Sequence, residues 1–291
     1  MGVFLTETDQ EAARNEEHPQ AESTWSIKGV MYATFAPFLR FFNAITEIIG
    51  LISVALAASQ LILNRKRAQI FGALFFRQLY NTGISALYPN GVVAILIGAL
   101  LMARLFEYMP RTMVENQFGY LFMIIVFREL GPLISGVILI ARSATAVTAE
   151  IGYLRLRREF QVLNGMGISP VFLFLFPVFV AFPVSLLLMF IYFDIVVFLS
   201  AYFVIWLADP DAQLMVLLLS ILDQISMNEI AINLVKALLG GVLIGVISIH
   251  FGARVENSFS EVSEAISNST TTQLLVFFVI NVLLSLLAYT Q

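Results

Sequence analysis

Long apolar runs, separated by short polar segments, dominate the chain. The clearest runs cover about residues 87–107, 118–141, 176–207, 231–251 and 273–289. Each run is long enough to cross the roughly 30 Å hydrocarbon core of a bilayer as a helix that rises about 1.5 Å per residue. The pattern therefore predicts an all-α polytopic membrane protein, with five transmembrane helices in a transmembrane domain of residues 87–289.

The first 86 residues do not follow this pattern. Residues 1–24 are polar and acidic, which is typical of a disordered cytoplasmic tail and unlike a secretory signal with its basic start and apolar core. Residues 25–86 contain an apolar stretch that charged side chains interrupt. The second half of that stretch, 45–63, either lies in the membrane interface or spans the bilayer, and we interpret 25–86 as an N-terminal interfacial region.

Basic residues fall mostly on one side of the predicted spans. With five spans and an internal N-terminus, the cytoplasmic side receives Arg65, Lys66, Arg67, Arg77, Arg142, Arg155, Arg157, Arg158 and Arg254. The outer side receives only Arg111 and Lys236. Because cytoplasmic loops carry an excess of Lys and Arg, this asymmetry predicts an N-in, C-out topology. A sixth span over 45–63 would place the N-terminus outside, which is the less favoured alternative.

Composition excludes several classes of function. The chain is 59% hydrophobic and 12% charged, with no cysteine and two histidines. These counts exclude a disulfide framework and argue against a thiolate or histidine metal site. A basic patch for nucleic acid is also missing. No catalytic residue stands out, and no G-x-x-x-x-G-K-[ST] nucleotide motif occurs in the sequence.

Several polar or small residues fall inside the predicted spans. Asp194 lies deep in the third span and should be neutral or paired, with structural pairing favoured over a proton relay. Asn281 lies midway along the fifth span and is expected to bond to another helix. The small-residue pairs Ala94-xxx-Gly98 and Gly241-xxx-Gly245 indicate close helix contact, which we assign to packing within the subunit rather than to a dimer seam.

Four segments resemble a known family. They are RQLYNTG (Arg77–Gly83), FRELGPLISGVILIARSATAVTAEIGYLR (Phe127–Arg155), MGISP (Met166–Pro170) and, more weakly, NSTTTQLL (Asn268–Leu275). Their sequence, order and spacing resemble the MlaE/YrbE permeases over about residues 45–289. The resemblance implies an MlaE-like permease fold, in which 45–63 is an interfacial elbow helix that precedes the five transmembrane helices.

Members of that family are membrane subunits of ABC transporters that move phospholipids or other lipids. The resemblance therefore implies a transporter subunit rather than an enzyme, without a cofactor of its own, because ATP and Mg²⁺ bind a partner ATPase. The implied partners are a cytoplasmic ABC ATPase, a periplasmic MCE-domain protein, a lipid, and a second permease copy that is either identical or a paralogue. The resemblance is also compatible with a small cytoplasmic regulatory subunit as a further partner. It implies that this chain is located in the inner membrane of a Gram-negative-type bacterium.

The resemblance places a coupling helix, which docks in the ATPase, at about residues 150–167. Its candidate contacts are Glu150, Gly152, Arg155, Arg158, Phe160 and Leu163. Periodicity alone equally fits an interfacial helix that binds anionic lipid. Arg158 stands where the family usually has Glu, so the partner ATPase should carry an unusual, complementary groove.

In the family, the lipid pathway lies between the first, second and fifth spans of a dimer. The candidate cavity residues here are Arg104, Glu107, Arg128, Glu129, Lys236 and Asn281. Arg104 and Glu107 are three residues apart and able to pair, and an interface anchor is favoured over a headgroup rim.

Arg128 and Glu129 precede Gly131-Pro132 inside the second span. Neighbouring side chains point about 100° apart on a helix, so each charge needs its own partner or water. We expect one charge to face a lipid cavity and the other to brace a neighbouring helix, with Lys236 a candidate partner for Glu129. The alternative is two braces and no cavity.

Two other classes of function compete with an ATP-driven lipid permease. An ion-coupled secondary transporter would show inverted repeats and several polar groups at the membrane midplane, and neither pattern is evident here. A membrane scaffold subunit is the third possibility, and co-purifying partners would distinguish it.

Overall fold

The computed structural model describes residues 50, 53, 65–108, 120, 122–208, 214–223, 225–256 and 258–289. The predicted acidic tail lies outside the described residues. The predicted elbow helix also lies outside them, except for Gly50 and Ser53.

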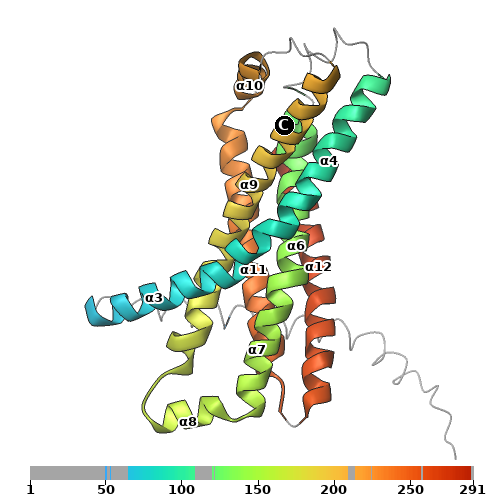
Figure 1. Cartoon of the computed structure of the whole chain (residues 1–291). Helices are drawn as coiled ribbons and strands as arrows, with labels where there is room; N and C mark the ends of the chain where they lie inside the picture. Colours follow the sequence, from blue (N-terminus) through green and yellow to red (C-terminus); the bar gives the residue numbers. More distant parts are fainter. Residues whose placement is uncertain are drawn as a thin grey trace, which may run out of the picture. The chain divides into compact units, whose positions relative to one another are not determined.

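Five helical stretches of the described chain are long and apolar enough to cross a membrane (Figure 1). They cover Ala68–Leu105, Ile124–Leu156, Val171–Ala208, Met227–Ala253 and Phe259–Ala288. This result confirms the predicted all-α fold with five spans. The stretches are longer than the apolar runs, because the helices continue beyond them, in the second and fifth spans into polar sequence.

The first span bends sharply near Gly83. Helix α3 (Arg65–Thr82) crosses the bundle at an angle, and η2 (Ile84–Ala86) joins it to α4 (Leu87–Tyr108), which runs along the bundle (Figure 1). The Thr82 and Ser185 hydroxyls are 2.7 Å apart, and Ser143 Oγ donates to the Thr82 carbonyl at 2.7 Å. A Cβ on Gly83 would lie 3.0 Å from Ser185 Oγ. The Thr-Gly of RQLYNTG therefore fixes the bend against two other spans.

The second span is one rod with two π-helical segments. Its elements are η3 (Met123–Leu130), α6 (Gly131–Leu139), η4 (Ile140–Ala144) and α7 (Thr145–Leu156). The short helix α8 (Glu159–Gly165) then lies across the end of the bundle (Figure 1).

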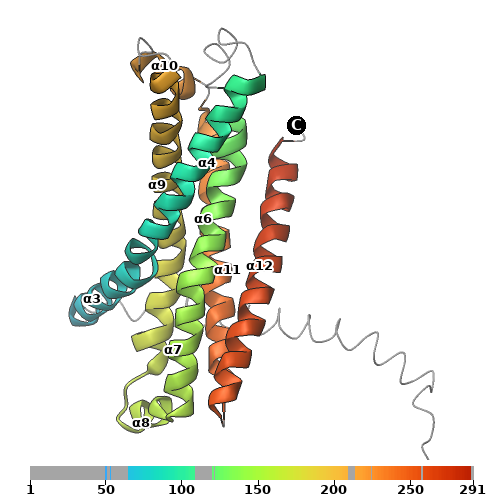
Figure 2. The ribbon, with the colours of Figure 1, turned by 45° about the vertical axis from the view of Figure 1, so that its right-hand side comes forward.

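The remaining spans follow in sequence. A π-helical turn, η5 (Val171–Leu175), leads into α9 (Phe176–Ala208), and α10 (Leu214–Leu222) lies at the opposite end of the molecule from α8 (Figure 1). Helices α11 (Met227–Ala253) and α12 (Phe259–Tyr289) complete the bundle, side by side in both views (Figure 2).

Glycines allow the spans to approach closely. The Phe277 ring of α12 lies against Gly136 and Gly240, which are on α6 and α11. Gly241 lies against the backbone of Pro183, and Gly98 against the Val197 carbonyl. Both small-residue pairs thus pack within the subunit, as predicted. Close backbone contact replaces the hydrophobic drive that helices lack in lipid.

A buried polar hub joins α7, α11 and α12 in the half of the bundle nearest α8. Gln273 donates to Ser248 Oγ at 3.0 Å and to Ser269 Oγ at 2.7 Å, and Ser269 Oγ lies 3.2 Å from Thr148 Oγ1. All four side chains are almost fully buried. The NSTTTQLL segment therefore holds three helices together, a role that sequence reasoning did not identify.

Candidate functional site

An interruption in the backbone hydrogen bonding of the second span lies at the most highly charged part of the membrane bundle. Pro132 lies in the first turn of α6, immediately after the π-helical η3. Proline has no backbone N–H to donate. In an α-helix the N–H at position 132 would bond to the Arg128 carbonyl, and in a π-helix it would bond to the Phe127 carbonyl. A carbonyl without a donor is costly inside a membrane.

Helix α11 supplies donors to both of these carbonyls. Lys236 Nζ lies 2.9 Å from the Arg128 carbonyl oxygen, and Asn233 Nδ2 lies 3.3 Å from that of Phe127. The two donors are three residues apart, so they share one face of α11. Both are about 1% exposed. Lys236 lies nine residues from the start of α11, or roughly 14 Å along the helix axis, so its ammonium needs a counter-charge.

Glu129 provides that counter-charge. Its Oε1 lies 3.7 Å from Lys236 Nζ, and its Oε2 accepts a hydrogen bond from Ser285 Oγ of α12 at 2.9 Å. The predicted Lys236–Glu129 pairing is confirmed. Ser285 was not identified from the sequence, because an isolated serine near the end of a span carries no signal of its partner.

Arg128 pairs in a different direction. Its Nη2 lies 3.6 Å from Glu229 Oε1, in the first turn of α11. The Glu229 side chain also receives the Ser226 N–H in a capping box, which fixes the carboxylate where Arg128 reaches it. We call Arg128, Glu129, Glu229 and Lys236 the charged cluster; its formal charges sum to zero.

The four members of the charged cluster differ in exposure. The Lys236 side chain is 1% exposed, those of Glu229 and Arg128 are 17% and 22% exposed, and that of Glu129 is 44% exposed. Arg128 and Glu129 therefore both brace α11, and Glu129 is the more open of the two.

The other cavity candidates lie apart from this cluster. Arg104 and Glu107 pair with each other at 2.5 Å near the end of α4, and both side chains are more than half exposed. The predicted pairing is confirmed. Asn281 is buried and donates to the Phe277 carbonyl of its own helix at 3.2 Å. The expectation that it bonds to another helix was wrong, because a carbonyl one turn earlier is within its reach.

The predicted coupling helix of residues 150–167 is not one helix. Glu150 and Arg155 belong to α7, which ends at Leu156, and α8 begins at Glu159. Arg158 separates the helices with φ of +59°, the only positive φ of a non-glycine residue in the described chain. This left-handed residue turns the backbone across the end of the bundle.

The coupling candidates divide into exposed and buried groups. Glu150, Arg155 and Arg158 are exposed, and Leu163 is partly exposed. Gly152 is buried against Val255 and Val262, which places it outside the reach of a docking partner.

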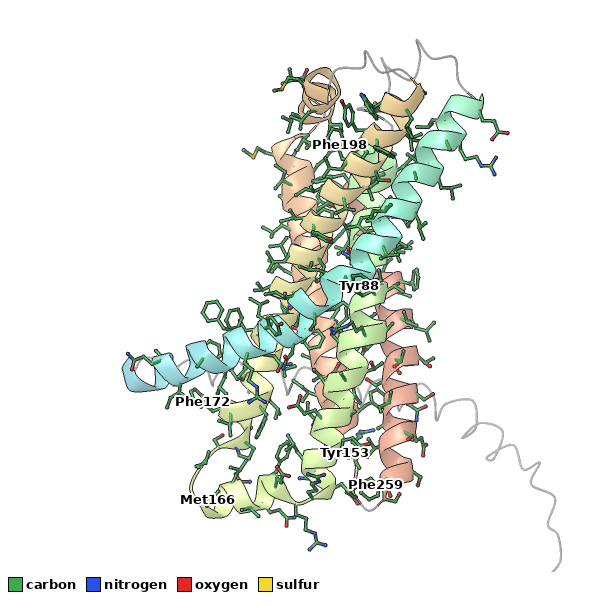
Figure 3. The ribbon with its side chains drawn as sticks, viewed as in Figure 1. Tyr88, Tyr153, Met166, Phe172, Phe198 and Phe259 are labelled. Atoms are coloured by element: carbon green, nitrogen blue, oxygen red, sulfur yellow. The ribbon has the colours of Figure 1, made fainter. Side chains whose placement is uncertain are left out.

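Phe160 is also buried, with its ring centroid 6.1 Å from that of Phe174, so it fastens α8 to the third span. Val162 and Met166 are each 60% exposed on the outward side, a pair that the sequence analysis did not single out. Figure 3 shows Met166 at the tip of this end of the bundle.

Asp194, in the half of the bundle away from α8, lacks within the described chain the partner that was predicted for it. It is 7% exposed, and neither carboxyl oxygen has a hydrogen-bond partner among the described residues. The expected structural pairing was therefore wrong within the described part of the chain. In place of a donor, the carboxyl group packs against Gly131, where a Cβ would lie 2.5 Å from Oδ1.

Comparisons with known proteins cover most of the chain. Residues 75–287 match the family described as Permease MlaE. A probable ABC transporter permease protein of Rickettsia prowazekii is 22% identical over 216 residues, which cover 74% of this chain and 83% of that protein. A similar protein of Rickettsia typhi is 21% identical over 220 residues, or 76% of this chain and 85% of that protein. The Haemophilus influenzae permease protein MlaE, of an intermembrane phospholipid transport system, is 26% identical over 97 residues, 33% of this chain and 37% of that protein.

Proposed function

The chain belongs to the MlaE permease family, and from that membership and the charged cluster we propose that it is the permease subunit of an ATP-driven lipid transporter. It is a multi-pass membrane protein, and the family identifies it as a permease subunit of a lipid transporter. The finer proposal is that it moves phospholipid or a related lipid between the inner membrane of a Gram-negative-type bacterium and a periplasmic MCE-domain partner.

Energy for transport comes, in this proposal, from a separate ABC ATPase that carries ATP and Mg²⁺. The sequence has no nucleotide motif of its own. The end of the bundle that carries α8 offers exposed apolar side chains, Val162 and Met166, beside the exposed bases Arg155 and Arg158. An apolar centre with a charged rim is the usual composition of a docking surface. We assign this end to the ATPase.

The observation that carries the lipid role is the exposure of Glu129 within a neutral cluster. Lys236 is enclosed, so it steadies the broken helix rather than meeting a ligand. The Glu129 carboxylate is fixed by Lys236 and Ser285, yet it is almost half exposed. In a membrane span, a charge left open in this way marks a polar path. Glu129 therefore guides the lipid headgroup, because its carboxylate binds hydrogen-bond donors or cationic groups that the headgroup carries.

A second permease copy fits the same proposal. Of the five candidate spans, that of α12 is the least buried by the described chain, followed by the first span. Apolar side chains such as Leu275, Val279 and Leu283 are more than half exposed along α12. A partner copy over these helices would enclose the open side of Glu129 in a shared lipid chamber.

The subunit assignment is tested by purifying the chain from its native membrane in mild detergent and recording a native mass spectrum. We expect two permease chains with an ABC ATPase, an MCE-domain protein and bound lipid. Ion-driven transport by the purified chain alone, without an ATPase, would overturn the proposal and favour a secondary transporter.

The role of Glu129 is tested with Glu129→Gln in the purified complex, reconstituted in liposomes with fluorescent phospholipid. Transport driven by ATP should fall at least tenfold, whereas Glu264→Gln, the same change at an exposed site on α12, should leave it unchanged. The abundance and melting temperature of the complex are measured in parallel. Undiminished transport by Glu129→Gln would rule out the headgroup role.

A further inference from the structure

An apolar cavity lies apart from the charged cluster. It measures about 350 Å³ and lies between α9, η3, α10 and the residues that precede α11. Phe122 and Phe198 form one wall, with ring centroids 5.9 Å apart, and Leu218 and Leu222 of α10 form another. Figure 3 places Phe198 near the end of the bundle that carries α10.

Among the described residues that line this cavity, Asp194 is the only ionisable one. Both of its carboxyl oxygens are buried and lack a hydrogen-bond partner among the described residues. On the side of the second span, the carboxyl group faces Gly131, where a Cβ would lie 2.5 Å from Oδ1. A buried carboxyl group without a donor is destabilising in either protonation state. A donor in the cavity would remove this cost once the Asp194 side chain turns toward it.

Several common ligands do not fit these surroundings. An ordered water needs two to four polar partners, and the lining offers one acid among apolar side chains. A metal ion needs more oxygen ligands than one carboxylate supplies, and the described residues contain no cluster of three metal-ligating side chains. An anionic headgroup would meet the Asp194 carboxylate, and the described residues of the lining include no basic side chain to offset the repulsion.

The volume of the cavity is too small for a whole helix. A helix with side chains is about 10 Å across, so about 4 to 5 Å of its length would fill 350 Å³. Access is from the membrane side, because Ile191, Ile195 and Leu199 line the cavity and are each about half exposed on α9. The ligand therefore enters from the lipid phase and is slender and mostly apolar.

We propose that this cavity binds a membrane-dissolved amphiphile whose hydroxyl or protonated amine bonds to Asp194 and whose apolar body lies against α9 and α10. The site is separate from the Glu129 path. Phe127 lines the cavity, whereas Arg128 and Glu129 do not. The ligand joins α9 to α10 and so acts on the segment between the third and fourth spans.

The test uses three photoreactive sixteen-carbon probes that differ only in their head: an amine, an alcohol and a methyl ether. The full chain is labelled in nanodiscs, and the labelled residues are mapped by mass spectrometry. We expect saturable labelling of α9 and α10 by the amine and the alcohol. The methyl ether, which has no donor, should require about tenfold higher concentration, the equivalent of one hydrogen bond.

Variants separate the head contact from the cavity itself. Asp194→Leu should weaken labelling by the amine and the alcohol to the level of the ether, whereas Asp194→Asn should weaken the amine alone. Leu222→Trp should fill the cavity and abolish labelling by all three probes. Leu207→Trp, at an exposed position of α9 outside the lining, should change nothing. Melting temperatures show which variants fold.

Two outcomes would overturn the proposal. Equal labelling by the ether and the alcohol in the unaltered chain would reduce the cavity to an apolar surface without a role for Asp194. Capture of a polypeptide by a photoreactive residue at Ile195, in the native membrane, would assign the cavity to a protein segment.

Discussion

Replacing Lys236 by methionine should remove the donor that compensates for the break at Pro132. The ammonium lies 2.9 Å from the Arg128 carbonyl oxygen and 3.7 Å from the Glu129 carboxylate. Methionine keeps most of the apolar stem, so packing changes little and the loss is mainly one charge and its hydrogen bond.

The contacts set the size of the effect. A hydrogen bond from a charged donor contributes about 1.5 to 3 kcal/mol in water-soluble proteins, and bonds between membrane helices average about 0.6 kcal/mol. The Glu129 pair adds less than about 1 kcal/mol, because its carboxylate is half exposed and keeps Ser285 as a donor. We expect Lys236→Met to lower the free energy of unfolding by about 2 kcal/mol.

A second substitution shows whether Pro132 is the reason that the Arg128 carbonyl needs the Lys236 donor. Pro132→Ala restores an N–H four residues after Arg128, so the carbonyl regains a donor within its own helix. In that background, the cost of Lys236→Met should fall to about 1 kcal/mol, and the difference is the coupling energy of a double-mutant cycle. Unfolding is followed by detergent titration of the purified chain in lipid bicelles.

A matched control is Leu238→Met, a change at an exposed position of the same helix, which should cost less than about 0.5 kcal/mol. The reasoning fails if Lys236→Met costs the same with and without the Pro132→Ala substitution, because Lys236 would then not replace the missing N–H.

Three further substitutions test the packing and the backbone. Gly131→Ala would place a methyl group 2.5 Å from Asp194 Oδ1, so the free energy of unfolding should fall by about 1 to 3 kcal/mol in the same titration; an unchanged midpoint would contradict this contact. Arg158→Gly should be about 0.5 to 1 kcal/mol more stable than Arg158→Ala, because only glycine adopts φ of +59° without strain; equal melting temperatures would argue against the left-handed turn. Gly241→Leu would press against the Pro183 backbone, which has no rotamer to yield, and should abolish recovery of folded protein in size-exclusion chromatography; a normal yield would refute it.

The five spans were predictable because hydrocarbon thickness sets a length that apolar runs either reach or do not reach. The Lys236–Glu129 pair was predictable for a related reason. Charges inside a membrane must find partners, and few ionisable residues are available at that depth. Physical requirements with few solutions can be read from sequence.

The remaining features were not predictable, because many different arrangements of residues would meet the same physical requirement. Arginine carries no signal for the left-handed conformation, so periodicity merged the end of α7 with α8 across Arg158. The sequence indicated that an acid at Asp194 needs compensation, but it did not indicate that the described residues would offer its carboxyl group no donor. The hub around Gln273 depends on hydroxyl groups from three helices, two of which, on Thr148 and Ser269, are 121 residues apart, and no local pattern joins them.

The proline and the charges of the second span form one chain of compensation. Pro132 removes one backbone N–H that the Phe127 or Arg128 carbonyl would accept, and α11 contributes donors to both carbonyls from Asn233 and a fully buried Lys236. The buried ammonium requires a carboxylate, which Glu129 provides while Ser285 holds its other oxygen. Each step removes a cost that the preceding step created, and only the last group remains open to its surroundings. The break in the helix therefore determines where the exposed charge lies, which makes Pro132 a positioning residue for Glu129 even though it presents no polar side chain of its own.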